Sequence, residues 1–555
     1  MDGMMKKLVK GFPAISVGIF YLAISIFAQT KTLDQLQREH VELRFGLFMH
    51  FNMNTYSPGW GNPRVNPLLF NPTSLDCSQW AKTAKAAGMT YALLTAKHHD
   101  GFVLWPSQQT PPNGQVRYTV AQSSVPTKDI VSEYVTAFRA QGLQPGLYFS
   151  MWDVANGVTG WSTAERTFVL GQLTELLGGK YGQIPILVID GWAWKMGHKT
   201  IPYQQIRDTV KSMQPNCLIV DHNGLMSPWE EDIFYVEEPK GLYCPAGNTA
   251  AACQGTTISG GWFWDASAAS AGSLMSLDNV ISHLNTLEPR YCNFLLNCPP
   301  NRSGVLDAAI VTRLTEVGAK WKPNASRAPL PTQMANIEHP ITPVSATASS
   351  GTASNAIDGI SDAGNVTPWT SSVNGYVTLD LGSTIQNIGI LGYLPSSLNA
   401  NAVITGYTVS VSTNNTTFTQ VASGTWPSNV NYRTVAFTPT DARYVRLTGT
   451  AAASGSTIVA SEVDVGVRTP VQNAPTLPHP RTSARHAEVA YRVTGGYFVF
   501  PVEFSHIVTD VSVYSLAGKL LRKATVSNGI FNFGKEYSGF DGVCLVKLTG
   551  LEPVR

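Results

Sequence analysis

The 555-residue sequence predicts a multidomain protein: a (β/α)8 barrel, then a β-sandwich, then a small all-β domain. Three observations predict this class. Apolar strand-like runs alternate with amphipathic helical stretches from about residue 31 to 325. From 338 to 467 only short alternating strands remain. Two proline-containing segments separate the blocks, and a chain of this length exceeds one ordinary hydrophobic core.

Composition narrows the class of protein. Hydrophobic residues make up 43% of the chain, as in a globular protein, whereas charged residues make up only 14%, below the usual quarter or so. Low charge with many small polar residues is common in exported proteins. The net charge of +2 gives no reason to expect nucleic acid or an anionic membrane surface as a partner.

The N-terminus has the pattern of a signal peptide. Lys6, Lys7 and Lys10 precede the apolar run GFPAISVGIFYLAISIFA, which ends at Ala28. A basic segment, an apolar segment and a small residue before the cut are the parts of a cleavable leader. We therefore expect residues 1–28 to be removed and the protein to be secreted or held at the cell surface; an uncleaved anchor is the alternative. No later run reaches the roughly 20 apolar residues of a membrane span.

The barrel prediction, over residues 29–330, rests on eight runs with helices between them. Amphipathic helices are expected at 77–88, 130–142 and 164–179. An open doubly wound sheet is the alternative, but no G-x-G-x-x-G follows the first run. The eight predicted strands are 45–51, 91–99, 146–152, 185–191, 216–223, 232–238, 260–265 and 291–300.

Polar and aromatic residues gather where these strands end. A barrel enzyme carries its functional side chains at the carboxyl ends of its strands. Each residue alone fits an ordinary structural role, but together they would face one mouth, which predicts a site. The candidates, strand by strand, are His50; His98 and His99; Tyr148 and Trp152; Asp190; His222 and Asn223; Glu237 and Glu238; and Trp264.

This set of residues fits glycosidic bond cleavage. Asp190 and either Glu237 or Glu238 supply two carboxylates from different strands, as a glycosidase requires. Histidine and asparagine bind hydroxyl groups, and tryptophan faces cover C–H surfaces. A metal-dependent hydrolase is the alternative interpretation of the same histidines and carboxylates. However, adjacent residues on a strand point in opposite directions, so His98 and His99 are not expected to share one ion, and no metal site is predicted.

Four motifs carry a family resemblance. FGLFMHF, AKHHDGF (96–102), the LVIDG run and NFLLNCPPNRSG (293–304) resemble the α-L-fucosidases of glycoside hydrolase family 29. The resemblance implies an exo-acting retaining double displacement on terminal α-L-fucose, with tryptophans near the nucleophile contacting the methyl group of the sugar. It also implies roles for the following residues: Asp190 as nucleophile, His50, His98 and His99 as fucose-binding histidines, Tyr148 from the third strand, and Trp60 over the sugar.

The acid/base residue is less well defined. If Ile233, Tyr235 and Glu237 share one face of a strand, Glu238 points away, which favours Glu237 and leaves Glu238 as the alternative. Many relatives carry an arginine after the fifth strand, where this chain has His222 and Asn223. A non-catalytic fucose- or glycan-binding surface protein therefore stays open, as does a related specificity such as α-L-galactoside. The fucosyl linkage is not predicted.

The second domain, 338–467, has a resemblance of its own. SNAIDGISD, PWTSS, VTLDLG and ARYVRL resemble the discoidin-like (coagulation factor 5/8 type C) jelly rolls, a fold shared by carbohydrate-binding family 32. The resemblance implies a sugar-binding module that often holds a structural calcium. We expect Trp369 to lie in the core, and Asp358 to serve a turn rather than a calcium ion.

The C-terminal part begins with a proline-containing linker, 468–487. The domain that follows, 488–555, is expected to be all-β. DVSVYSLAGKLLRK and a closing VKL resemble the C-terminal sorting domains of type IX secretion cargo, which implies the secretion machinery as a partner. A third binding sandwich is the alternative.

Cysteine usage gives weaker evidence. The seven cysteines include no C-x-x-C pair, which argues against a structural zinc site. Cys244 and Cys253 flank a loop-like segment and are candidates for a disulfide after export. Cys292 and Cys298 lie on one strand-like run and are too far apart to bond.

Overall fold

The structure is a computed structural model that describes residues 30–59, 64–198, 200–266, 270–333, 337, 340–360 and 367–468, and the strands of a C-terminal unit. The chain forms two compact units, 1–470 and 471–555. The predicted signal peptide, Trp60 and most of the predicted linker lie outside the described residues. Within the described part of the chain, no helix has both the length and the apolar character needed to cross a membrane.

The first domain is built on eight parallel strands, hydrogen-bonded in the order β5-β4-β3-β2-β1-β8-β7-β6. Asp232 N, just before β6, donates to Ile219 O of β5, which brings the first and last strands of this order together. The predicted barrel class is confirmed. The strands are β1 Phe45–Met49, β2 Tyr91–Lys97, β3 Gln144–Ser150, β4 Ile186–Asp190, β5 Leu218–Asp221, β6 Phe234–Glu237, β7 Ala252–Thr257 and β8 Cys292–Asn297.

The prediction for the seventh strand was wrong. The strand is Ala252–Thr257, sequence ACQGTT, and not the aromatic run 260–265. Its apolar side chains are small because large neighbours occupy the space: a Cβ on Gly255 would lie 1.8 Å from the Tyr235 hydroxyl. The tryptophan-rich run instead forms a loop beyond the carboxyl end of β7.

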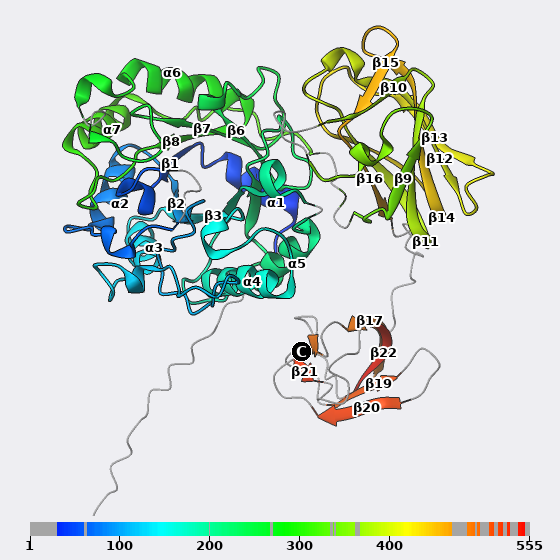
Figure 1. The fold of residues 1–555 in the computed structure, drawn as a ribbon, viewed down its shortest axis with the longest axis horizontal. Coiled ribbons are helices and arrows are strands. Elements are labelled where there is room, and N and C mark those ends of the chain that lie inside the picture. The colour runs from blue at the N-terminus through cyan, green and yellow to red at the C-terminus, as the bar shows by residue number, and fades with distance from the viewer. Residues whose placement is uncertain are drawn as a thin grey trace, which may run out of the picture. The chain divides into compact units, whose positions relative to one another are not determined.

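Helices surround the strands, as Figure 1 shows. The three helices predicted by residue range are present as α2, α3 and α4. Their first turns are capped by Asp76, Asp129 and Ser162, whose side chains accept from backbone N–H groups. The helices are α1 Leu33–Val41, α2 Cys77–Ala86, α3 Ile130–Ala140, α4 Thr163–Leu177, α5 Tyr203–Met213, α6 Leu277–Leu287 and α7 Ala308–Lys320.

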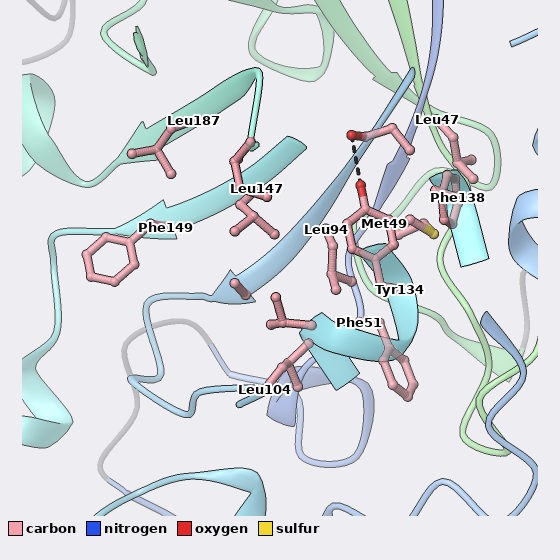
Figure 2. Close-up of a cluster of buried hydrophobic side chains, with 14 of the residues drawn as sticks. Leu47, Met49, Phe51, Leu94, Leu104, Tyr134, Phe138, Leu147, Phe149 and Leu187 are labelled. Carbon is pink, nitrogen blue, oxygen red and sulfur yellow. Dashed lines mark hydrogen bonds between the residues drawn. The ribbon is translucent and has the colours of Figure 1, made fainter. Parts of the chain in front are cut away.

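Alternation along the strands creates two apolar layers. Outward residues such as Leu47, Leu94 and Leu147 pack against the helices, and Figure 2 shows this layer beside Tyr134 of α3. Inward residues, including Val188 and Tyr235, fill the barrel interior. Residues two positions apart on a strand face the same side, so the residues two positions after Val188 in β4 and Tyr235 in β6 also point inward, at the mouth of the barrel. Those side chains belong to Asp190 and Glu237.

The second domain is an antiparallel β-sandwich. Its main sheet has the order β13-β12-β14-β11-β16, with β9 beside β11, and β10 pairs with β15. Short strands were expected here, but two of the strands are long: β11 has 19 residues with bulges in its pairing, and β14 has 20. Its strands are β9 Ser345–Ala348, β10 Trp369–Ser372, β11 Tyr376–Leu394, β12 Ile404–Ser412, β13 Thr419–Thr425, β14 Arg433–Ala452, β15 Thr457–Ala460 and β16 Glu462–Val467.

The prediction for Trp369 is confirmed, and for Asp358 the structure shows the turn contact that was expected. Trp369 is fully buried in its core, and its Nε1 donates to Ser350 O. Asp358 serves a turn, since its Oδ1 accepts from Ile360 N.

The C-terminal unit contains antiparallel strands, as expected. One sheet has the order β17-β22-β19-β20, and β18 pairs with β21. The strands are β17 His486–Val493, β18 Tyr497–Val499, β19 Asp510–Tyr514, β20 Leu520–Thr525, β21 Ile530–Asn532 and β22 Gly542–Thr549.

The predicted disulfide is absent. Cys244 and Cys253 are both free and buried. Cys253 lies in β7, where its Sγ is 3.2 Å from His40 Nε2. This cysteine is therefore a buried residue of the barrel and does not link two ends of a loop. Cys292 and Cys298 are also free, as expected.

Candidate active site

A pocket of about 230 Å³ opens at the carboxyl ends of the barrel strands. Its volume suits a single sugar ring rather than a chain of sugars. The pocket is lined by Phe48, His50, His98, Asp190, Trp194, His222, Glu237, Lys240 and Trp262.

Asp190, the last residue of β4, is almost completely buried and has several donors. Its Oδ2 accepts from the Tyr148 hydroxyl at 2.6 Å, and its Oδ1 accepts from Trp194 Nε1 at 2.6 Å. Burial raises the pKa of a carboxyl, but the charges of His222 and His99 and the hydrogen bonds outweigh it and hold the pKa of Asp190 well below its ordinary value. The group is therefore an ionised carboxylate, as a nucleophile must be.

The residue after Asp190 has to be glycine. Gly191 adopts φ +66°, and a Cβ there would lie 2.6 Å from Trp152 Cβ. This tight turn leads into a π-helical turn, Trp192–Met196, which returns the Trp194 indole to the carboxylate. Trp192 itself is fully buried and donates to Ile201 O.

Glu237, the last residue of β6, lies in the same pocket and is also buried. Its Oε1 accepts from Trp262 Nε1 at 3.0 Å, and its Oε2 is 2.9 Å from Lys240 Nζ. Glu238 points the other way, toward His283 of α6, whose Nε2 is 3.0 Å from its Oε2. The structure thus places Glu237, and not Glu238, beside Asp190.

His222 stands between the two carboxylates. Its Nδ1 is 3.0 Å from Asp190 Oδ2, and its Nε2 is 3.4 Å from Glu237 Oε2. Burial lowers the pKa of an imidazole, but the charges of Asp190 and Glu237 outweigh burial and raise the pKa of His222. The charged form of His222 is therefore favoured where many relatives were expected to carry an arginine.

The other histidines of the mouth are poor cations. Burial lowers the pKa of His50 to about 3, and its Nδ1 is 2.8 Å from Asn297 Oδ1. Burial also lowers the pKa values of His98 and His99. Neutral imidazoles can both donate to and accept from sugar hydroxyls.

The expectation that His98 and His99 diverge was wrong. Strand β2 ends at Lys97, so both histidines lie in the turn beyond it, and their rings are 4.3 Å apart. His98 lines the pocket, and His99 Nε2 is 3.5 Å from Asp190 Oδ2. In the described part of the chain, no group of three His, Cys, Asp or Glu side chains is placed to hold a metal ion.

Two residues that were predicted to contact the sugar, Asn223 and Trp264, do not line the pocket, and Trp60 lies outside the described residues. Asn223 is fully buried and donates to Glu231, so it holds its own loop together. Trp264 donates to Asp307 Oδ2 and does not line the pocket. Its place is taken by Trp262, two residues earlier. Phe48, Trp194, Lys240 and Trp262 line the pocket without having been singled out individually.

A buried charge cluster lies beside the pocket, around His198. His198 Nε2 is 2.7 Å from Asp221 Oδ2, and its Nδ1 is 2.5 Å from Glu230 Oε2. Burial lowers the pKa of His198, but the charges and hydrogen bonds of Glu230 and Asp221 outweigh burial and raise it to about 10.

This cluster gives a pH-dependent stability. Since the folded state holds the His198 proton more tightly than the unfolded state, the stabilisation is complete below about pH 6.5 and is lost as pH rises toward 10. The NMR resonance of the His198 imidazole can be assigned because it disappears in His198→Gln, and it should titrate near pH 10. The thermal unfolding midpoint of the wild type should decrease as the pH is raised from 7 to 10. An imidazole that titrates near its ordinary pKa would contradict this.

Comparison with known proteins agrees with this geometry. The profile of the α-L-fucosidase family matches residues 12–325, and the profile of the F5/8 type C domain matches 340–463. The first match covers more than half of the chain. The chain therefore belongs to the α-L-fucosidase family and carries an F5/8 type C domain behind its barrel.

Individual relatives match the barrel part. The chain is 34% identical to α-L-fucosidase 1 of Arabidopsis thaliana over 299 residues, covering 49% of this chain and 56% of the relative. It is 33% identical to the tissue α-L-fucosidase of Homo sapiens over 109 residues, covering 19% and 21%. A solved α-L-fucosidase from Lactobacillus casei matches with a TM-score of 0.42 and 21% identity, covering 52% and 97%. The matched part of the chain spans about half the length of the Arabidopsis relative and about a fifth of the human one.

Proposed function

We propose that the protein is an exo-acting, retaining α-L-fucosidase that releases terminal α-L-fucose from fucosylated glycans. The observation that carries the proposal is the pair Asp190 and Glu237, which approach one sugar-sized pocket from different strands with His222 between them. Membership of the α-L-fucosidase family supports the same substrate.

In the proposed mechanism Asp190 attacks the anomeric carbon while Glu237, which must first take up a proton, donates it to the departing glycosidic oxygen. This step forms a covalent fucosyl ester and frees the aglycone. Glu237 then takes a proton from a water molecule, which displaces Asp190 and yields fucose with retained configuration. Tyr148 and Trp194 hold the Asp190 carboxylate in position through the two hydrogen bonds described above.

The test is fucose release by the full-length protein from an aryl α-L-fucoside, with the aryl α-L-galactoside as a matched comparison. We expect faster release from the fucoside, because the pocket offers the apolar surfaces of Phe48, Trp194 and Trp262 for the methyl group. Oligosaccharides with α1,2, α1,3, α1,4 and α1,6 fucose would then assign the linkage. Binding of fucose without any release would support the non-catalytic alternative.

We also propose that the protein is exported, with the segment 1–28 as its signal peptide and the C-terminal unit as a sorting domain. The support is the sequence pattern of the leader and of DVSVYSLAGKLLRK. N-terminal sequencing of the protein from its native host should begin after Ala28, and deletion of 488–555 should keep the protein from the cell surface and the medium. An intact N-terminus and unaltered export would contradict these two proposals.

We propose in addition that the sandwich holds a structural calcium at Asp358 and Glu462. Asp358, expected from the sequence to serve a turn rather than an ion, would then do both. The Glu462 carboxyl is buried, accepts from Gly359 N at 2.6 Å and shares a hydrogen bond with Asp358; burial and the nearby carboxylates raise the pKa of Glu462 well above its ordinary value. A hard cation would replace the shared proton and find oxygen donors only, which suits calcium.

Calcium removal gives the corresponding prediction. A chelator should lower the unfolding midpoint of the wild type, and added calcium should restore it, because an ion that binds only the folded state stabilises it. Asp358→Ala should respond to neither. An unfolding midpoint of the wild type that ignores both chelator and calcium would contradict the site.

A further inference from the structure

Two connections of the barrel contact both the candidate active site and the β-sandwich. The β4–α5 connection, 191–202, carries Trp194, and the β5–β6 connection, 222–233, carries His222. Both of these side chains contact Asp190. The barrel and the sandwich belong to the same compact unit, and the far parts of both connections pack against the sandwich.

The β5–β6 connection docks through an apolar cluster. Leu225 and Trp229 pack with Leu394 and Tyr432 of the sandwich, and Trp229 and Tyr432 are almost completely buried. Trp229 Nε1 donates to Asp464 Oδ2 at 2.8 Å, and Tyr432 N donates to Ser227 Oγ at 2.8 Å. A buried indole whose N–H is satisfied across the junction fixes both the position and the rotation of this connection.

The β4–α5 connection docks beside it. His198 N donates to Gly359 O of the sandwich at 3.2 Å. The His198 ring stacks on Trp229 with centroids 5.2 Å apart, and on the barrel side it contacts Trp192 at 4.6 Å and Tyr203 at 5.0 Å. Contact therefore runs from the sandwich through Trp229 and His198 to Trp192, two residues from Trp194. The Asp221 partner of His198 immediately precedes His222.

We propose that Trp229 is a positioning residue, and that the sandwich acts through it to hold Trp194 and His222 against Asp190. The sandwich is then part of the framework of the active site, in addition to any glycan that it binds. This inference rests on the proposed function for its kinetic consequences, but its structural part can be tested without activity.

The experiment compares three variants of the full-length protein. Trp229→Phe keeps an aromatic ring and removes the donor to Asp464, and Trp229→Ala removes both. The matched control, Arg443→Gln, breaks an ion pair with Asp380 inside the sandwich and leaves the junction untouched. Each protein is measured by amide hydrogen exchange, thermal unfolding and fucosidase kinetics well below the unfolding midpoint.

We expect faster exchange in peptides covering 191–198 and 222–233 in Trp229→Ala, a smaller effect in Trp229→Phe, and none in the control. With aryl fucoside, kcat should fall about tenfold in Trp229→Ala, less than the roughly hundredfold that a 1 Å misplacement can cause, while KM changes less than about twofold. Such a split indicates lost transition-state contacts rather than lost binding.

Unchanged exchange in both connections, or changes confined to sandwich peptides, would overturn the inference. If the wild type itself released no fucose, the proposed function would fail, but the exchange data would still decide whether the sandwich positions the two connections. If Trp229→Ala did not fold, Trp229→Phe against Arg443→Gln would carry the same test.

Discussion

Replacing Asp190 by glycine should reduce fucose release by roughly 10⁴-fold or more, because the first chemical step then lacks its nucleophile. The carboxylate is kept ionised by His222 and His99 and is held by Tyr148 and Trp194. No other described carboxylate of the pocket has the same set of donors. The measurement is kcat with an aryl α-L-fucoside at neutral pH, with thermal unfolding as the control for folding.

Azide separates a lost nucleophile from a damaged site. In Asp190→Gly a small anion can enter the space of the missing carboxylate and attack the same carbon, so azide should restore turnover and give β-L-fucosyl azide. Because His50 and His98 still line the pocket, the sugar should still bind. Activity of Asp190→Gly close to that of the wild type would rule out this residue as the nucleophile.

Replacing Glu237 by glutamine should have an effect that depends on the leaving group. Without a proton donor, substrates with a natural sugar aglycone should lose about 10²- to 10⁴-fold in kcat, whereas an activated aryl fucoside needs little protonation and should lose much less in its first step. Burial beside Trp262 and Lys240 places this carboxyl at the pocket rather than in bulk water.

The adjacent carboxyl provides the matched control. Glu238 is next in the chain, has the same chemistry and pairs with His283 outside the pocket. Glu238→Gln should therefore keep nearly all activity on both kinds of substrate. If Glu238→Gln lost activity in the leaving-group-dependent manner and Glu237→Gln did not, the assignment of the acid/base role would be reversed.

The barrel could be predicted from the sequence because most of its strands are apolar runs that end at a polar residue. ILVID and FYVE lie inside the buried sheet, and the parity of Tyr235 and Glu237 correctly separated the inward carboxyl from the outward one. The seventh strand could not be found in this way. ACQGTT is short of large apolar residues because Tyr235 already fills the space in front of Gly255, a fact of tertiary packing.

The site was predicted best where one residue ends one strand. Asp190 and Glu237 follow from strand register, but loop residues do not. Trp262 reaches Glu237 while Trp264 turns to Asp307, and nothing in the local pattern distinguishes these two tryptophans. Lys240 was missed because it lies beyond the strand end.

The junction with the sandwich was also beyond prediction. Trp229 contacts Asp464 across 235 residues of sequence, and His198 N donates to Gly359 O in the other domain. No periodicity or turn signal encodes such a contact. The contacts between domains can therefore be identified only from the structure, even where each domain is recognised from its sequence.

The most direct test of the central claim is to trap the covalent intermediate. A 2-deoxy-2-fluoro-L-fucosyl fluoride has a good leaving group, and its C2 fluorine slows hydrolysis of the ester, so a retaining enzyme accumulates as the fluorofucosyl adduct. Mass spectrometry of the intact protein should show one added fluorofucosyl group, and peptide mapping should place it on Asp190. An adduct on another carboxylate, or fucose released with inverted configuration and no adduct, would contradict the account.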